Sequence, residues 1–368
     1  MSDAVDSCGI WDYTWSVLVQ ASSDYDGLIL FLFTIARQHP FVQVSILCLF
    51  VSLLTFVVSS ITHNYSQVDK LWSIIPFLYT WLLVNNGRTF LMACCATVWG
   101  LRLTWNFYRR GGYTWPQFWL GDEDYRWKLI QQGHVLPILT NPKVWIMFNA
   151  VFISLYQNVL LLLIVTPSAV AYAASQPELV HCFGTKKDNR GTALGRADVI
   201  IAIVFCLLVV FETIADNQQY RFQTGKYEWR RTKSKPPQSK KEQEYADGFC
   251  QSGLFAILRK PNYAAEQAIW ITFYLFSIVA TIPSETASRQ FWFVNWSWVG
   301  CFLLILLFQG SGWLTEKITI SKYGTKYRDY QKRVPLYVPT LSGIRSAIQH
   351  NLFLSNSPSD KARSKKKR

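Results

Sequence analysis

The stretch FVQVSILCLFVSLLTFVVSSI, residues 41–61, runs for 21 positions without a charged side chain. A helix needs about 20 apolar residues to cross a hydrocarbon core of roughly 30 Å. This stretch therefore predicts a membrane-spanning helix, and its length is the standard against which other apolar stretches of the chain are compared.

The composition of the whole chain is typical of a membrane protein. Half of the 368 residues are hydrophobic and 16% are aromatic, whereas the mean hydropathy is only +0.12. Apolar blocks must therefore alternate with polar connections. Six further stretches are candidates for spanning helices: 71–84, which is short, 90–107, 144–172 with a possible break at Pro167, 199–215, 264–282 and 291–314. We expect an all-α polytopic bundle of about seven transmembrane helices.

The distribution of basic residues predicts the orientation and the domains. Lys and Arg outnumber Asp and Glu by 37 to 23, and the excess gathers in a predicted loop at 217–260 and in the tail, which two helices separate. Both can then face the cytosol. The predicted organisation is a non-cytosolic segment 1–40 with an interfacial stretch at 28–36, membrane helices in 41–197, a C-terminal membrane region 198–340, and a basic cytosolic tail 341–368.

The end of the chain indicates a compartment. Lys365 and Lys366 are the fourth and third residues from the C-terminus, which is the spacing of a dilysine retrieval signal of the endoplasmic reticulum. A plain basic tail is the alternative interpretation. Both the loop around 232–244 and the last dozen residues are too polar to bury a core, so we expect them to be disordered.

Several classes of protein are disfavoured. The basic runs carry no nucleic-acid recognition motif. The five histidines form no H-x-x-H box, so a di-iron site is not expected and we predict no metal. No G-x-G-x-x-G sequence follows a predicted strand, and any dinucleotide would therefore bind among helices.

Polar residues inside apolar segments are expensive and mark candidate functional sites. Glu212 and Asp216 are four residues apart, so they share one face of the helix predicted at 199–215 and its extension, with Arg221 following. A polar helix end that meets water would explain the same residues.

A second cluster lies in GLFAILRKPNYAAEQAIW, residues 253–270. Arg259 and Lys260 precede a proline that is favoured in the first turn of a helix. Two cations beside a helix N-terminus suit a phosphate, and Asn262 and Glu266 share the next helix face, with Tyr263 between them. A capping sequence would explain the proline but not the whole group.

A third cluster is the tail KYGTKYRDYQKRVPLYVP, residues 322–339, in which Tyr323, Tyr327 and Tyr330 recur at helical spacing among cations. Interfacial anchoring alone would favour such residues. In the N-terminal half, Asp69 and Arg102 are predicted to form an intramembrane ion pair, near Tyr108.

Three motifs together resemble the steroid 5α-reductase-like family of integral membrane proteins, including its DUF1295-type branch. They are E-x-x-x-D-x-Q at 212–218, GL…LRKPNY…E at 253–266, and K-Y…Y-R-D-Y…V-P…P at 322–339. The resemblance extends more weakly to V-D-K-L-W around Asp69 and W-G-L-R-L around Arg102, and so covers most of the chain.

The resemblance implies a membrane-embedded, NADPH-dependent oxidoreductase that reduces a carbon–carbon double bond of a lipid such as a sterol, an enone or an enoyl chain. Its implied partners are the bilayer and a lipid substrate. The implied cofactor-binding residues are Asp216, Asn262 and Glu266, with Arg221, Arg259, Tyr263 and Tyr330. The implied groups that polarise the substrate are Asp69 and Tyr108.

The chain departs from the family pattern, and two other functions stay open. Lys260 stands where histidine is usual, and Ala264 and Ala265 stand where Phe-Gly is usual. An S-adenosylmethionine-dependent methyltransferase of the isoprenylcysteine carboxyl type shares part of the second motif, but it favours Ser at the position of Asn262 and a second Glu after Glu316. A non-catalytic membrane scaffold that inherited the fold is the third possibility.

Overall fold

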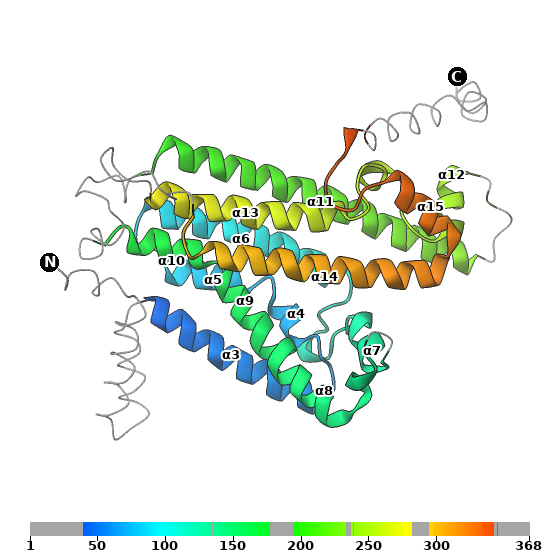
Figure 1. Ribbon diagram of the computed structural model, residues 1–368, viewed down its shortest axis with the longest axis horizontal. Helices are drawn as coiled ribbons and strands as arrows, with labels where there is room; N and C mark the ends of the chain where they lie inside the picture. Colours follow the sequence, from blue (N-terminus) through cyan, green and yellow to red (C-terminus); the bar gives the residue numbers. More distant parts are fainter. Residues whose placement is uncertain are drawn as a thin grey trace. The chain divides into compact units, whose positions relative to one another are not determined.

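The computed structural model describes residues 40–133, 136–176, 194–232, 237, 239–281, 294–341 and 344. Every element of regular secondary structure in these ranges is a helix (Figure 1). The predicted all-α class is therefore confirmed for the described part of the chain.

Five segments of the described chain are long and apolar enough to cross a membrane, rather than seven. They are α3 (Pro40–Thr62), Pro142–Ala173, α11 (Arg196–Arg231), α13 (Pro261–Thr281) and α14 (Trp298–Tyr323). The predicted helices at 71–84 and 90–107 do not qualify, so the expected count was wrong for these residues.

The two failures have different physical causes. The first stretch is divided between α4 (Gln67–Leu71) and α5 (Ile75–Leu82), and the eight residues of α5 reach only about 12 Å at 1.5 Å per residue. The second stretch is α6 (Gly87–Tyr108), whose 22 residues are long enough. However, Arg88, Arg102 and Asn106 make this helix too polar to qualify.

The segment Pro142–Ala173 is a succession of four helical pieces. They are α8 (Pro142–Phe148), the π-helix η4 (Asn149–Tyr156), α9 (Gln157–Leu163) and α10 (Thr166–Ala173). Pro167 lies in the first turn of α10, where its missing N–H leaves no helical bond unmade. The predicted break at Pro167 is thus confirmed.

Helix α11 is longer than its apolar stretch. Its 36 residues would extend about 54 Å, and its last turns carry Arg221, Lys226, Arg230 and Arg231. The prediction that residues 217–260 form a loop was therefore wrong for its first part. Helix α14 likewise continues past the predicted end at residue 314 to Tyr323.

Shorter elements complete the described chain. They are η2 (Phe118–Leu120), α7 (Tyr125–Gln131), η3 (Pro137–Thr140), α12 (Lys240–Asp247), η7 (Gly253–Ala256) and α15 (Thr325–Arg333). Gly324 separates α14 from α15 with φ +60°, a backbone conformation that favours glycine.

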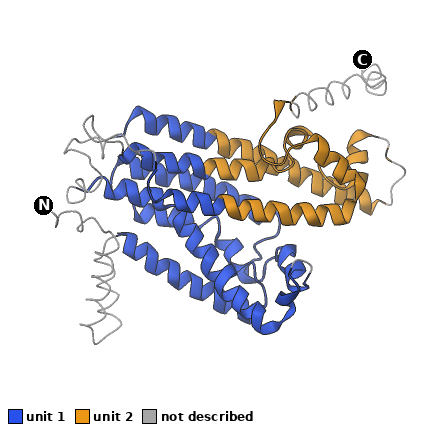
Figure 2. Ribbon diagram, in the orientation of Figure 1, with its two compact units in different colours: residues 1–206, 270–304 blue, residues 207–269, 305–368 orange. Residues whose placement is uncertain are grey.

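The chain divides into two compact units (Figure 2). Unit 1 comprises residues 1–206 and 270–304, and unit 2 comprises residues 207–269 and 305–368. Helices α11, α13 and α14 each contribute one part to each unit. Of the residues singled out from the sequence, Asp69 and Tyr108 belong to unit 1, and the candidate cofactor-binding residues all belong to unit 2.

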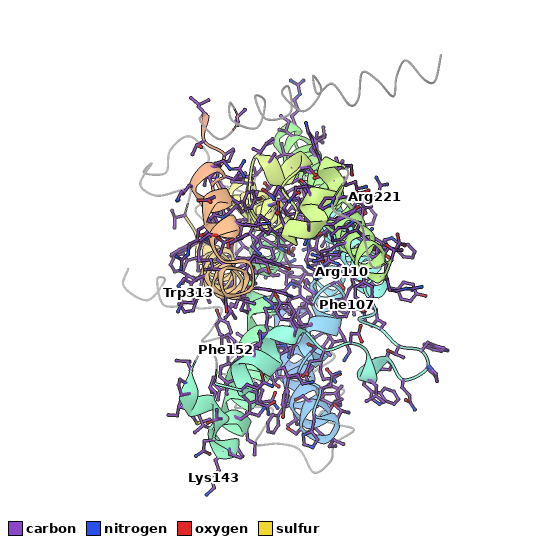
Figure 3. All side chains as sticks on the ribbon, turned by 90° about the vertical axis from the view of Figure 1, so that its right-hand side faces the viewer. Phe107, Arg110, Lys143, Phe152, Arg221 and Trp313 are labelled. Carbon is purple, nitrogen blue, oxygen red and sulfur yellow. The ribbon has the colours of Figure 1, made fainter. Side chains whose placement is uncertain are left out.

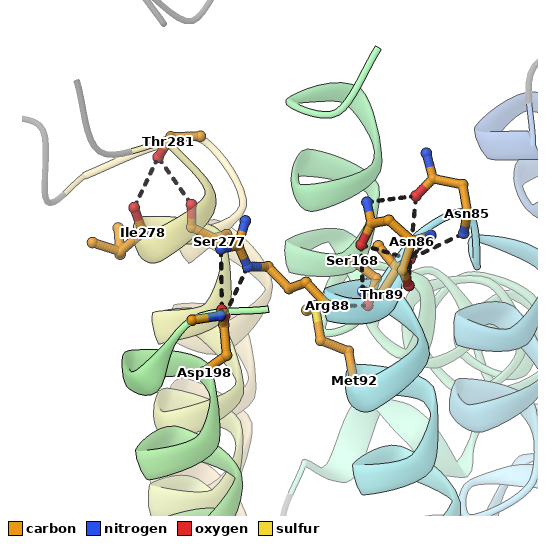
Figure 4. A network of polar contacts seen from close by, with 11 residues as sticks. Asn85, Asn86, Arg88, Thr89, Met92, Ser168, Asp198, Ser277, Ile278 and Thr281 are labelled. Atoms are coloured by element: carbon orange, nitrogen blue, oxygen red, sulfur yellow. Dashed lines mark hydrogen bonds and ion pairs between the residues drawn. The ribbon is translucent and has the colours of Figure 1, made fainter. Parts of the chain in front are cut away.

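A buried ion pair joins α6 to α11 in unit 1 (Figure 4). The guanidinium of Arg88 donates from Nε to Asp198 Oδ1 at 2.7 Å and from Nη2 to Oδ2 at 3.1 Å. The side chains are 3% and 0% exposed. Asp198 Oδ2 also accepts the backbone N–H of Gly195 at 2.8 Å, so this carboxylate both orders the start of α11 and holds it to α6.

Some predictions fall on residues outside the described ranges. They are the non-cytosolic segment 1–40 up to residue 39, its interfacial stretch at 28–36, the dilysine signal at the C-terminus, and the disorder expected for the last dozen residues and for 233–236 and 238 of the loop 232–244. The disorder expected for the end of this loop was wrong, because residues 240–244 lie in the helix α12.

We predict that Asp198→Ala destabilises the protein by about 3–5 kcal/mol, because it leaves the buried Arg88 guanidinium without its carboxylate. The measurement is denaturant-induced unfolding in detergent. The control is Asp329→Ala, which removes an exposed carboxylate 2.9 Å from Lys332 and should cost at most about 1 kcal/mol. Equal losses in the two variants would contradict a structural role for the buried pair.

Candidate functional site

The motif on α11 meets the motif on α13 in unit 2. Asn262 Nδ2 donates to Asp216 Oδ1 at 3.3 Å. Glu212, Asp216 and Glu266 are 4%, 3% and 3% exposed. Since Glu212 and Asp216 share one face of α11, and Asn262 and Glu266 share one face of α13, the contact turns both polar faces toward the space between these helices. The predicted face-sharing is reproduced, and the structure brings Asp216 and Asn262 together.

Gln218, the last residue of the α11 motif, holds the turn that begins the second motif. Its Oε1 accepts the backbone N–H of Leu254 at 2.9 Å. Gly253 has φ +62°, and a Cβ at this position would lie 2.7 Å from the Gln218 amide. Gln218 of the first motif and the glycine at position 253 of the second are therefore both needed for the two motifs to pack against each other.

Arg259 is held by α14, by α15 and by the segment that follows α15. Its Nη2 lies 3.0 Å from Glu316 Oε2, and its Nη1 donates to the carbonyls of Gln331 and Val334 at 3.1 and 2.5 Å. Its backbone N–H donates to Pro335 O at 2.9 Å. The guanidinium that the sequence offered as a phosphate ligand is thus engaged by protein acceptors.

Glu316 on α14 is the centre of this arrangement. Its carboxylate accepts hydrogen bonds from the Tyr327 hydroxyl and, at 2.6 Å, from Gln331 Nε2. Burial raises the pKa of the Tyr327 hydroxyl, and the hydrogen bond to Glu316 raises it further. Tyr327 therefore stays a neutral donor, and the carboxylate of Glu316 is satisfied by three donors, two from α15 and one, Arg259, from the segment before α13.

The sequence analysis missed the role of Glu316. Glu316 lies two residues beyond the apolar stretch predicted at 291–314, so it was not counted among the polar groups of a spanning helix and entered only through the family comparison with methyltransferases. Its spacing from Tyr327 and Gln331, 11 and 15 residues along the chain, is not that of one continuous helix. The turn at Gly324 brings α15 back onto α14, and no helical periodicity indicates such a turn.

Tyr330 also has a structural contact. It is 2% exposed, and its hydroxyl donates to Phe255 O at 2.5 Å. Burial raises the pKa of this hydroxyl. Tyr330 therefore orders the turn η7 through a main-chain carbonyl.

The remaining candidates of unit 2 lie at its more open positions. Arg221 is exposed (Figure 3). The ring of Tyr263 packs edge-on against Phe308, with centroids 4.9 Å apart. The Lys260 ammonium lies 5.5 Å from the centre of the Tyr263 ring. A half-buried cation therefore stands immediately before the first turn of α13.

In unit 1, Asp69 is held by Trp127, whose indole N–H donates to Asp69 Oδ2 at 3.1 Å. Burial raises the pKa of the Asp69 carboxyl, and the nearby Asp124 raises it further, whereas Arg126 opposes the shift. The predicted pairing of Asp69 with Arg102 is not found in the described structure. The reason is that the chain from residue 119 to 127 folds over α4 and supplies the partners of this turn.

Tyr108 lies at the end of α6 with 57% of its surface exposed. Its ring is 5.8 Å from that of Trp105, and no hydrogen bond of its hydroxyl is found in the described structure. No contact in the described part of the chain brings Tyr108 to Asp69. The predicted roles of both residues stay predictions.

The comparisons with known proteins identify the family. A family model described as "Protein of unknown function (DUF1295)" matches residues 55–334. The chain belongs to the DUF1295 family. An uncharacterized protein of Schizosaccharomyces pombe is 34% identical over 319 residues, which cover 83% of this chain and 82% of that relative. No solved structure matches.

The DUF1295 match begins within α3 and ends at Val334, just after α15. It therefore includes the contact of Asp216 with Asn262 and the contacts of Glu316. The resemblance to this branch is therefore confirmed as a family. The wider relation to steroid 5α-reductases stays a prediction.

We predict that Arg259→Lys destabilises the protein by about 2–4 kcal/mol, because one ammonium cannot replace the guanidinium between Glu316 and two carbonyls. Denaturant-induced unfolding in detergent measures this loss. The matched control is Arg333→Lys at an exposed position, where Nη2 lies 3.3 Å from Gln251 and the loss should stay within about 0.5 kcal/mol. If both substitutions were equally mild, Arg259 would be available to a ligand instead.

Proposed function

We propose that this DUF1295 protein is a membrane-embedded, NADPH-dependent reductase of a carbon–carbon double bond in a lipid. The observation that carries the proposal is the contact of Asp216 with Asn262. It joins, inside unit 2, the two motifs whose family resemblance implies a nicotinamide cofactor. The lipid substrate and a location in the endoplasmic reticulum, inferred from the C-terminal lysines, are parts of the same proposal.

The buried residues fit the uncharged, hydroxyl-bearing parts of such a cofactor. Ribose hydroxyls and a carboxamide are donors, and buried carboxylates are acceptors that need donors. Asp216, Asn262 and Glu266 would hold these groups. When bound, NADPH supplies the hydride.

The phosphates of NADPH need a different place, because negative charge among three buried acids is unfavourable. Lys260 and Arg221 are better placed, one beside the first turn of α13 and the other exposed on α11. Arg259 and Tyr330 do not fit a direct role, since protein acceptors already engage both Nη atoms of Arg259 and the hydroxyl of Tyr330. These two act as positioning residues in the proposal.

The geometry of unit 1 favours Asp69 over Tyr108 as the acid that polarises a substrate carbonyl. Burial and the nearby Asp124 favour the protonated form of Asp69, and a protonated carboxyl can donate a hydrogen bond. Trp127 fixes its orientation by donating to Oδ2. Among the described residues, Tyr108 makes only a ring contact with Trp105, and its surface is largely exposed.

An S-adenosylmethionine-dependent methyltransferase is the second candidate, and one observation favours it. Three carboxylates buried in one unit suit a sulfonium cation as well as ribose hydroxyls. Against it, Glu316 is engaged by Arg259, and Lys317 follows where that family favours a second Glu. A non-catalytic scaffold predicts that neither cofactor binds.

We predict that NADPH raises the unfolding temperature of the purified protein in detergent and that Asp216→Asn abolishes this shift. A ligand at about 100 times its Kd stabilises the folded state by about 2.7 kcal/mol. The substitution keeps an oxygen that can accept from Asn262, so the fold should persist. It removes the negative charge that the ribose hydroxyls would meet.

The matched control is Asp329→Asn, the same change at an exposed position of α15, which should keep the full NADPH shift. S-adenosylmethionine is measured in parallel. A shift with S-adenosylmethionine alone would replace the reductase by the methyltransferase. No shift with either cofactor would leave the scaffold as the better explanation.

A further inference from the structure

The connection between α6 and α7 in unit 1 exposes a run of large apolar side chains. Trp115 is 88% exposed, Phe118 51%, Leu120 48% and Trp119 38%. Single exposed apolar residues are common, but four within six positions form a contiguous patch of the kind that marks an interaction site.

The backbone of this connection is firmly held. The carbonyl of Trp119 accepts from Gln67 Nε2 and from Lys70 Nζ, each at 3.0 Å. The carbonyl of Gly121 accepts from Asn64 Nδ2 at 2.8 Å. The exposed rings are therefore carried on an ordered support, and their exposure does not result from a loose chain.

The residues that hold the connection fix its level relative to the candidate membrane spans. Asn64 lies two residues after α3 ends at Thr62. Tyr65, the next residue, packs edge-on against Trp145 at 4.9 Å, and Trp145 is in the first turns of the span Pro142–Ala173. The patch is thus attached where one span ends and another begins, which is the boundary between hydrocarbon and water.

The exposed cations of the same unit fit a lipid surface. Trp and Phe together with cations are typical of the membrane–water interface. Lys128 is exposed, as are Arg110 and Lys143 (Figure 3). Two of the three acids of the connection are engaged by the protein, since Glu123 accepts the N–H of Tyr65 at 2.7 Å and Asp124 pairs with Arg126, whereas Asp122 is exposed.

We propose that residues 113–120 are a membrane-interface anchor. Trp115, Phe118 and Leu120 insert among the lipid headgroups and upper acyl chains at the end of α3, and the exposed cations contact lipid phosphates. The anchor fixes the height of the short helix α4, and therefore of Asp69, relative to the bilayer surface. This proposal does not depend on the identity of the cofactor.

The test replaces Trp115 by p-benzoylphenylalanine, a photoreactive aromatic residue of similar size, in the full chain reconstituted in phosphatidylcholine nanodiscs. After irradiation, mass spectrometry of the peptide measures the fraction that carries a phospholipid. The matched control is the same replacement at Gln131, an exposed polar position at the end of α7. We expect roughly tenfold more lipid adduct at position 115 than at position 131, because the native tryptophan indicates a place at the membrane interface and the native glutamine a place in water.

Equal lipid adducts at the two positions would overturn the anchor, as would the absence of adduct at position 115. A predominant cross-link from position 115 to a second copy of the chain would also overturn it, and would identify the patch as a protein interface. Because Trp115 is 88% exposed, its replacement leaves the core intact. The unfolding temperature of each variant checks this.

Discussion

A hydrocarbon solvent offers no hydrogen bonds, so every polar group within a spanning helix must find a partner in the protein. This constraint accounts for the principal polar contacts of the described chain. Arg88 and Asp198 satisfy each other in unit 1. Within the same unit, Asn158 donates to Thr55 at 3.1 Å and Asn149 donates to Ser59 at 2.9 Å. These contacts fix which face of each helix turns inward, because a rotation would strand a buried polar group.

The same constraint decides how much of the fold was predictable. The apolar stretch at 41–61 gave the bounds of α3 almost to the residue, because hydrophobicity and helix coincide there. In α11 they separate: the apolar stretch ends at residue 215, but the helix continues to Arg231. Polar residues such as Gln219 and Arg221 form helices readily. A hydropathy pattern therefore predicts where the apolar part of a helix ends, but not where the helix itself ends. In α6 the prediction failed in a different way. The helix is long enough to span a membrane, but its arginines make it too polar to qualify as a spanning helix.

The candidate site also has features that the sequence predicts and features that it does not. The i to i+4 spacing correctly placed Glu212 with Asp216 and Asn262 with Glu266, since helical geometry alone determines which residues share a face. The family resemblance assigned Asp216 and Asn262 to one cofactor site, but neither it nor the spacing predicted their direct contact. The partners of Arg259 could not be predicted, because Glu316 lies 57 residues away along the chain and reaches it only through the packing of α14. A sequence pattern gives the charge of Arg259 but not which acceptor it meets.

The contacts of unit 2 bear on the departure from the family pattern at position 260, where lysine stands in place of the usual histidine. Arg259, Gln218 and Tyr330 hold backbone segments in place, and a change at any of them would disturb the fold of unit 2. Lys260 differs, because within the described residues its side chain has only a ring contact with Tyr263, and its backbone N–H bonds to Leu336 O whatever the side chain is. Exchange of histidine for lysine there leaves the packing intact and alters the group next to the first turn of α13. In the proposed reductase, the exchange would therefore change a contact with the cofactor and leave the contact of Asp216 with Asn262 in place.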